Sequence, residues 1–83
     1  MDFRVYVIIE VPILDKKYDL FVPVDRRIHD IIRSIKESDK ELSQGFYEKR
    51  KLNLYNKSNG QLYDLNLIIK NSDIKMGTRL ILM

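Results

Sequence analysis

The feature that most constrains this chain is a single helical stripe of isoleucines between segments whose residues alternate as strands do. The stripe occupies positions i, i+3, i+4 and i+7: Ile28, Ile31, Ile32 and Ile35. This spacing places four apolar side chains on one side of an α-helix. One helix can cover only one face of a sheet, so the flanking strands must share it. The sequence therefore predicts an α+β fold with one helix packed on one face of a mixed sheet.

The ends of this helix are less strongly marked than its middle. Asp25 can cap the first turn, because its side chain can accept a hydrogen bond from the free backbone N–H groups there. Leu42 extends the apolar stripe if the helix continues through Ser38 and Asp39. Gly45 is then a suitable residue to end the helix.

Two strands joined by a polar turn are expected before the helix. Residues 3–10 alternate and are rich in β-branched side chains, which indicates a strand. Residues 12–17 contain Pro12, which lacks a backbone donor, and the polar run Asp15-Lys16-Lys17. Residues 18–23 alternate again and end at a proline. The pattern predicts a β-hairpin.

Three shorter strands are expected after the helix. Residues 51–55 alternate, the Asn59-Gly60 pair favours a hairpin turn, and residues 62–63 would form the returning strand. Leu67 to Ile69 and Ile74 should pack a connecting loop before the final strand. The order is β-β-α-β-β-β in a four- to five-stranded sheet, with the first and last strands parallel and adjacent. Five residues should support the helix: Val5, Val7, Leu20, Leu80 and Leu82.

Composition limits the class of protein. The 83 residues form one domain, 1–83, and contain no cysteine, which excludes disulfides and thiol chemistry. The net charge of +3 comes from 15 basic and 12 acidic residues, which indicates a mixed surface rather than a nucleic-acid footprint. The amino terminus resembles no signal peptide, and no apolar run reaches the ~20 residues that span a bilayer. We therefore expect a cytoplasmic protein that is not inserted in the membrane.

The sequence offers little to an enzyme. His29 is the only histidine, so a zinc site has no second imidazole or thiolate to complete it. No serine or cysteine stands in a recognisable relation to this base, and the three glycines are too scattered to cradle a phosphate. We expect no catalytic activity, no cofactor and no metal.

The end of the chain carries a resemblance to a known family. Ile74-Lys75-Met76-Gly77-Thr78-Arg79-Leu80-Ile81-Leu82 is similar to the ending of ubiquitin-like β-grasp domains, in which an isoleucine, a turn and alternating leucines close the fold. Among small members without a Gly-Gly tail, the chain most resembles the YukD/EsaB family of Gram-positive type VII (WXG100, or ESX-type) secretion systems. The sequence given ends at Met83 without Gly-Gly, so we expect docking rather than conjugation.

The resemblance also implies an interaction surface. Ubiquitin is recognised on the sheet face opposite its helix, where alternating residues of the last strand contribute. The corresponding residues here, with two from the first strand, are Tyr6, Ile8, Arg79, Ile81 and Met83. Tyr55 would join them if the third strand has the expected register. The implied partner is a membrane-associated component of a type VII system, such as its ATPase, and a second copy of the chain is the other candidate.

A basic segment gives an alternative of a different class. Lys49, Arg50 and Lys51 lie close to Phe46, Tyr47 and Tyr55, a combination that can bind phosphates and stack on bases. This pattern suggests a small regulatory domain that binds RNA. Glu41 and Glu48 weaken the positive field, which favours a solvated loop instead.

Overall fold

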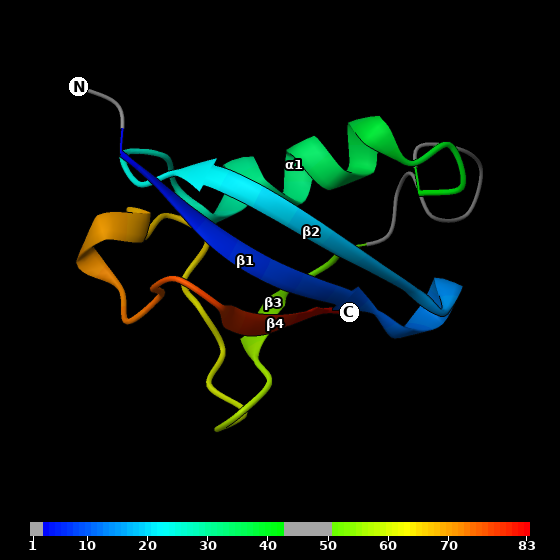
Figure 1. Cartoon of the computed structure of the whole chain (residues 1–83). Helices are drawn as coiled ribbons and strands as arrows, with labels where there is room; N and C mark the ends of the chain where they lie inside the picture. The colour runs from blue at the N-terminus through cyan, green and yellow to red at the C-terminus, as the bar shows by residue number, and fades with distance from the viewer. Residues whose placement is uncertain (1–2, 43–50) are drawn as a thin grey trace.

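The computed structural model describes residues 3–42 and 51–83, which form one sheet and one α-helix (Figure 1). The elements in chain order are β1 (Arg4–Val11), η1 (Pro12–Leu14), β2 (Lys16–Pro23), α1 (Ile28–Ser38), β3 (Leu54–Asn56), η2 (Ile69–Asn71) and β4 (Thr78–Leu82). The strands lie in the order β2-β1-β4-β3. β1 and β4 are parallel, and both outer pairs are antiparallel. The expected mixed sheet with one helix on one face is confirmed.

The first hairpin is longer and tighter than the sequence suggests. Every residue of β1 is paired with one of β2, from Arg4 opposite Pro23 to Val11 opposite Lys16. The connection needs only the 3₁₀ turn η1 and Asp15, whose N–H donates to the carbonyl oxygen of Pro12 at 3.0 Å. Asp15 has φ 53°, a left-handed conformation that aspartate tolerates better than most residues.

The core lies between α1 and the inner face of the sheet. All four isoleucines of the stripe are buried, as are the alternate residues of the two central strands. Of the five residues expected to support the helix, Val7, Leu80 and Leu82 are fully buried, while Val5 and Leu20 are partly buried. Burial of each such side chain stabilises the fold by about 1.5–3 kcal/mol. The fully buried Ile9 and Ile69 complete the layer.

The predicted amino-terminal cap of α1 is wrong. The helix begins at Ile28 with Arg27 as its cap residue, and Asp25 lies in the preceding turn. Asp30 instead accepts a hydrogen bond from the N–H of Arg27 at 3.1 Å. The N–H groups of Ile28 and His29 donate to carbonyl oxygens of a distant loop, at Leu67 and Leu65. These carbonyls satisfy the donors that a side-chain cap would otherwise satisfy.

The helix also ends earlier than the extended stripe predicts. α1 stops at Ser38, because Asp39 is extended with φ −108° and ψ 115°. Leu42 is nevertheless fully buried, so the chain returns it to the core without a helix. The predicted stop at Gly45 lies outside the described residues.

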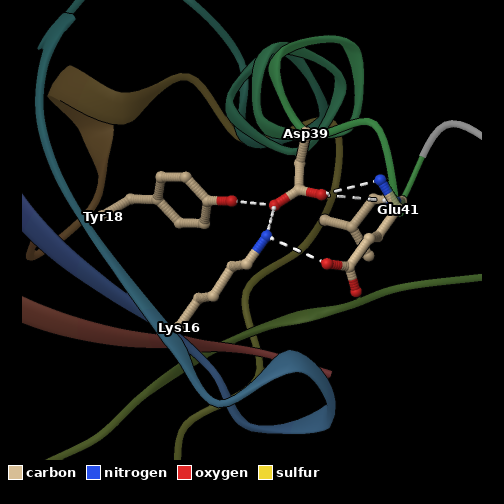
Figure 2. A network of polar contacts seen from close by, with 5 residues as sticks. Lys16, Tyr18, Asp39 and Glu41 are labelled. Carbon is tan, nitrogen blue, oxygen red and sulfur yellow. Dashed lines mark hydrogen bonds and ion pairs between the residues drawn. The ribbon is translucent and has the colours of Figure 1, made fainter.

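Asp39 fixes this end of the helix to β2 (Figure 2). Its carboxylate accepts a hydrogen bond from the hydroxyl of Tyr18 and lies 3.0 Å from Nζ of Lys16. The other carboxylate oxygen accepts from the N–H groups of Glu41 and Leu42. The bond from Tyr18 and, to a smaller extent, those from Lys16 and the backbone hold the pKa of Asp39 below its usual value. This nearly inaccessible carboxylate is therefore fully partnered.

The third strand is shorter than predicted and its return strand is nearly absent. β3 covers Leu54–Asn56, although Asn53 continues the ladder with two backbone bonds to Met83. The expected strand at residues 62–63 is reduced to one bridge, between Leu62 and Tyr55. Of the Asn59-Gly60 pair, only the glycine has a positive φ, of 73°.

Tyr63 is a buried polar centre that joins the hairpin to the loop before β4. Its hydroxyl donates to Oδ1 of Asp73 at 2.7 Å and accepts from Nδ2 of Asn56 at 3.0 Å. The side chain of Asn56 also accepts from the N–H of Ser58, which closes the turn. Burial, together with the bond to Asp73, raises the pKa of Tyr63 to about 12.

Candidate docking surface

The face of the sheet opposite α1, here called the outer face, is built by strand register. Ile8 is paired with Asp19 of β2 on one side and with Arg79 of β4 on the other. Ile81 is paired in turn with Glu10 of β1 and Tyr55 of β3. Because neighbouring residues of a strand face opposite sides, these paired side chains share the face away from the core. The predicted outward register of the last strand and of Tyr55 is confirmed.

One end of the outer face carries an aromatic cluster. The rings of Tyr6 and Phe21 lie 5.5 Å apart at 40° to each other. The N–H of Tyr6 lies 3.1 Å from the sulfur of Met76, which brings that side chain to the same end. Phe21 is 63% exposed and Met76 is 64% exposed. Exposed apolar side chains gathered in this way are typical of an interface.

The middle of the outer face is charged. Glu10 lies 2.7 Å from Nζ of Lys57 and 3.8 Å from Nζ of Lys17. The hydrogen bond from Lys57 has the largest effect on the pKa of Glu10, which lies below its usual value, and Lys17 and Arg79 lower it further. The glutamate is therefore a carboxylate at neutral pH, among three cations.

A second apolar group lies beyond these charges. Ile81 and Tyr55 are half-buried neighbours on β4 and β3. Met83 follows at the same strand parity and is 52% exposed. Its backbone is held by the two bonds to Asn53, of 2.8 and 3.0 Å.

The structure thus places the predicted surface residues together and adds others. Tyr6, Ile8, Arg79, Ile81 and Met83 all lie on the outer face, but a charged centre divides their apolar side chains into two groups. Sequence reasoning missed four contributors: Phe21, Met76, Glu10 and Lys57. The alternation of β2 already places Phe21 opposite Leu20 and Val22, so parity could have found it. The Glu10–Lys57 pair depends on strand order.

The other candidate sites are weaker. Lys49 and Arg50 of the basic segment lie outside the described residues, and Lys51 is exposed. His29 lies 3.4 Å from the carboxylate of Asp30 and lines an open groove of about 720 Å³ beside Leu65. Within residues 3–42 and 51–83, no group of three or more histidine or acidic side chains is arranged to hold a metal.

Solved structures with the same architecture identify the fold. A structure described as molecular mimicry of SUMO that promotes DNA repair matches with a TM-score of 0.75 and 15% identity, over 96% of this chain and 90% of that chain. The ubiquitin-like domain of an Arabidopsis thaliana protein matches with a TM-score of 0.72 and 12% identity, over 96% of this chain and 76% of that chain. This chain has the ubiquitin-like β-grasp fold.

The same β-grasp fold occurs as a small part of a larger assembly. A chain of the ESX-3 core complex matches with a TM-score of 0.68 and 14% identity, over 96% of this chain but 16% of that chain. At such identities the likeness shows the fold alone. Comparisons with protein-family models and with curated proteins find no match. In the described part of this ubiquitin-like domain, no helix is long and apolar enough to cross a membrane.

Proposed function

We propose that this ubiquitin-like domain is a non-enzymatic docking module that binds another protein through its outer face. The observation that carries this proposal is the pair of apolar groups on that face, with Phe21 and Met76 more than half exposed. In the residues that the structure describes, α1 packs on the inner face and does not cover the outer face (Figure 1). Reversible docking uses such surfaces.

The partner that we propose is a membrane-associated component of a Gram-positive type VII secretion system, reached from the cytoplasm. Two observations support this choice. The segment from Ile74 to Leu82 resembles the ending of ubiquitin-like β-grasp domains, and among small members of that fold the chain most resembles the YukD/EsaB family. A chain of the ESX-3 core complex contains a part with the same fold. In this role the domain acts as an accessory or regulatory subunit by non-covalent contact.

A binding measurement tests the proposal. The purified domain is titrated against the cytoplasmic region of an FtsK-like ATPase of a type VII system, and the Kd is measured by calorimetry. We expect Ile81→Asp to raise the Kd by at least about tenfold, because the charge would be desolvated in the interface. Ser34→Asp is the matched control, since Ser34 is exposed on α1, on the opposite side of the sheet.

Three outcomes would contradict the proposal. The unchanged domain could fail to bind, Ile81→Asp could bind equally well, or Ser34→Asp could weaken binding as much. A steep fall of affinity with salt, accompanied by binding to RNA, would favour the basic segment instead, because phosphate contacts release counterions.

A further inference from the structure

The charged centre of the outer face contains more positive charges than negative ones. Its strands and the residue after β3 contribute three cations: Lys17, Lys57 and Arg79. The same face carries two carboxylates, Glu10 and Asp19. Asp19 accepts a hydrogen bond from the hydroxyl of Tyr6 at 3.1 Å, so it is held toward the aromatic end. Glu10 lies among the three cations.

Of the three cations around Glu10, Arg79 has the weakest internal partner. Lys57 holds Glu10 at 2.7 Å and Lys17 lies at 3.8 Å, whereas no carboxylate of residues 3–42 and 51–83 forms an ion pair with Arg79. The exposed arginine borders a shallow cavity of about 100 Å³ with Ile8, Glu10 and both lysines. This cavity is large enough for a carboxylate beside the guanidinium, which binds such groups with two parallel hydrogen bonds.

The apolar groups lie on both sides of this cavity. Tyr6 and Phe21 lie on one side of it, and Ile81 and Tyr55 lie on the other. A ligand that covers the whole face must therefore present an anion between two apolar side chains.

We propose that the outer face recognises a protein segment that carries an aspartate or glutamate between large apolar side chains, with that carboxylate paired to Arg79. This inference rests on the proposed docking function and states the chemistry of the partner. Charge complementarity of this kind selects the partner and fixes its position on the face. Glu10 limits the attraction, because it already neutralises one of the three cations around it.

The same observations argue against a nucleic acid on this face. Bases stack on free aromatic faces beside a continuous positive groove. Here the rings of Tyr6 and Phe21 contact each other, and the carboxylates of Glu10 and Asp19 lie on the same face as the cations. A single carboxylate can fit between these acids and reach Arg79, whereas a chain of phosphates would meet both.

Two labelled peptides and one oligonucleotide test the inference. The first peptide carries a central Glu-Glu flanked on both sides by Leu-Phe, the second has Gln-Gln at its centre, and the oligonucleotide is single-stranded poly(dT). Binding is measured by fluorescence anisotropy, and the contacted residues are mapped by NMR shifts. We expect the glutamate peptide to bind about tenfold more tightly than the glutamine peptide. The NMR shift changes that this peptide causes in the domain should centre on Ile8, Arg79 and Ile81.

Three variants then locate the preference. Arg79→Gln should reduce the ratio of the two peptide affinities to about one. Glu10→Gln should tighten binding of the glutamate peptide severalfold, because it releases Lys57 and Lys17. Arg33→Gln makes the same change as Arg79→Gln on the exposed side of α1 and should have no effect.

Equal affinity for the two peptides, absence of binding to the glutamate peptide, or a preference that survives Arg79→Gln would overturn the inference. Tighter binding to poly(dT) than to the glutamate peptide would do the same. The proposed function fails separately. If the secretion ATPase does not bind while the peptide preference depends on Arg79, the function is wrong and the inference stands. If the ATPase binds through Ile81 but Arg79→Gln does not change the peptide preference, the proposed function stands and the inference is wrong.

Discussion

The carboxylate of Glu10 in β1 reaches across β4 to the ammonium group of Lys57, 2.7 Å away, at the end of β3. The pair joins two strands that share no backbone hydrogen bond in the strand order. Solvent screens a pair of this kind, so we assign it little stabilising effect. Its importance lies in the surface that it creates, because it separates the two apolar groups of the outer face.

Strand parity gives the first prediction. Leu80→Asp should unfold the domain, because Leu80 is fully buried and an unpaired charge there costs several kcal/mol. Ile81→Asp should remain folded, since Ile81 is half exposed on the opposite face beside Arg79 and Glu10. Thermal unfolding followed by circular dichroism compares the two variants. A folded Leu80→Asp beside an unfolded Ile81→Asp would show that the register of β4 is reversed.

Asp39 gives a prediction on pH. Asp39→Asn should lower the free energy of unfolding by about 1–3 kcal/mol at pH 7, because it weakens the contacts to Lys16 and Tyr18. The folded-state pKa of Asp39 lies below its ordinary value of 3.8, so its contribution is complete above that value and disappears as pH falls through the lowered pKa. The difference between variant and unchanged domain should therefore shrink below about pH 4. Urea unfolding at several pH values measures it, and a constant difference down to pH 2 would contradict the assignment.

Tyr63 should titrate at a higher pH than an ordinary tyrosine. Its pKa of about 12 exceeds the ordinary 10.0, so the neutral phenol is favoured in the folded state. Its contribution to stability is present below pH 10.0 and is lost as pH rises toward about 12. Tyr63→Phe should cost about 1–2 kcal/mol at pH 7, because Asn56 and Asp73 lose a partner. Ultraviolet titration of both proteins should show the late phenolate disappearing in the variant.

Gly77 isolates a backbone effect. It has φ +83°, and a methyl group added there would meet no atom within 4 Å. Gly77→Ala should therefore destabilise the domain by about 1–2 kcal/mol through the left-handed conformation alone. Gly77→Asn should cost less, because asparagine tolerates this region, and a D-alanine introduced by chemical synthesis should cost nothing. If L-alanine and D-alanine are equally destabilising, steric contact rather than φ is responsible.

Periodicity made the core and the outer face predictable from the sequence. The isoleucine stripe fixed the buried side of α1, and the alternation around Leu80 and Ile81 gave the two faces of β4. These patterns depend only on the geometry of one element, so no knowledge of its neighbours is needed.

Features that depend on distant segments could not be predicted in this way. The cap at Asp25 was a reasonable local choice, but carbonyl groups of Leu65 and Leu67 satisfy the first donors of the helix. The end of α1 depends on how Asp39 contacts β2. The charged centre of the docking surface required the order of the strands, since Glu10 and Lys57 are far apart in the sequence.

The parallel pairing of β1 with β4 has a consequence for how the domain is made. The centre of the sheet joins an early segment of the chain to a late one, from Val7 opposite Thr78 to Glu10 opposite Ile81. On a ribosome, β1 can form its hairpin with β2 at once, but its other edge stays unpaired until β4 has been synthesised and has left the exit tunnel. Such long-range closure slows folding and exposes the waiting strand to aggregation. A truncated product that ends before Thr78 should be a substrate for chaperones and proteases rather than a smaller folded domain.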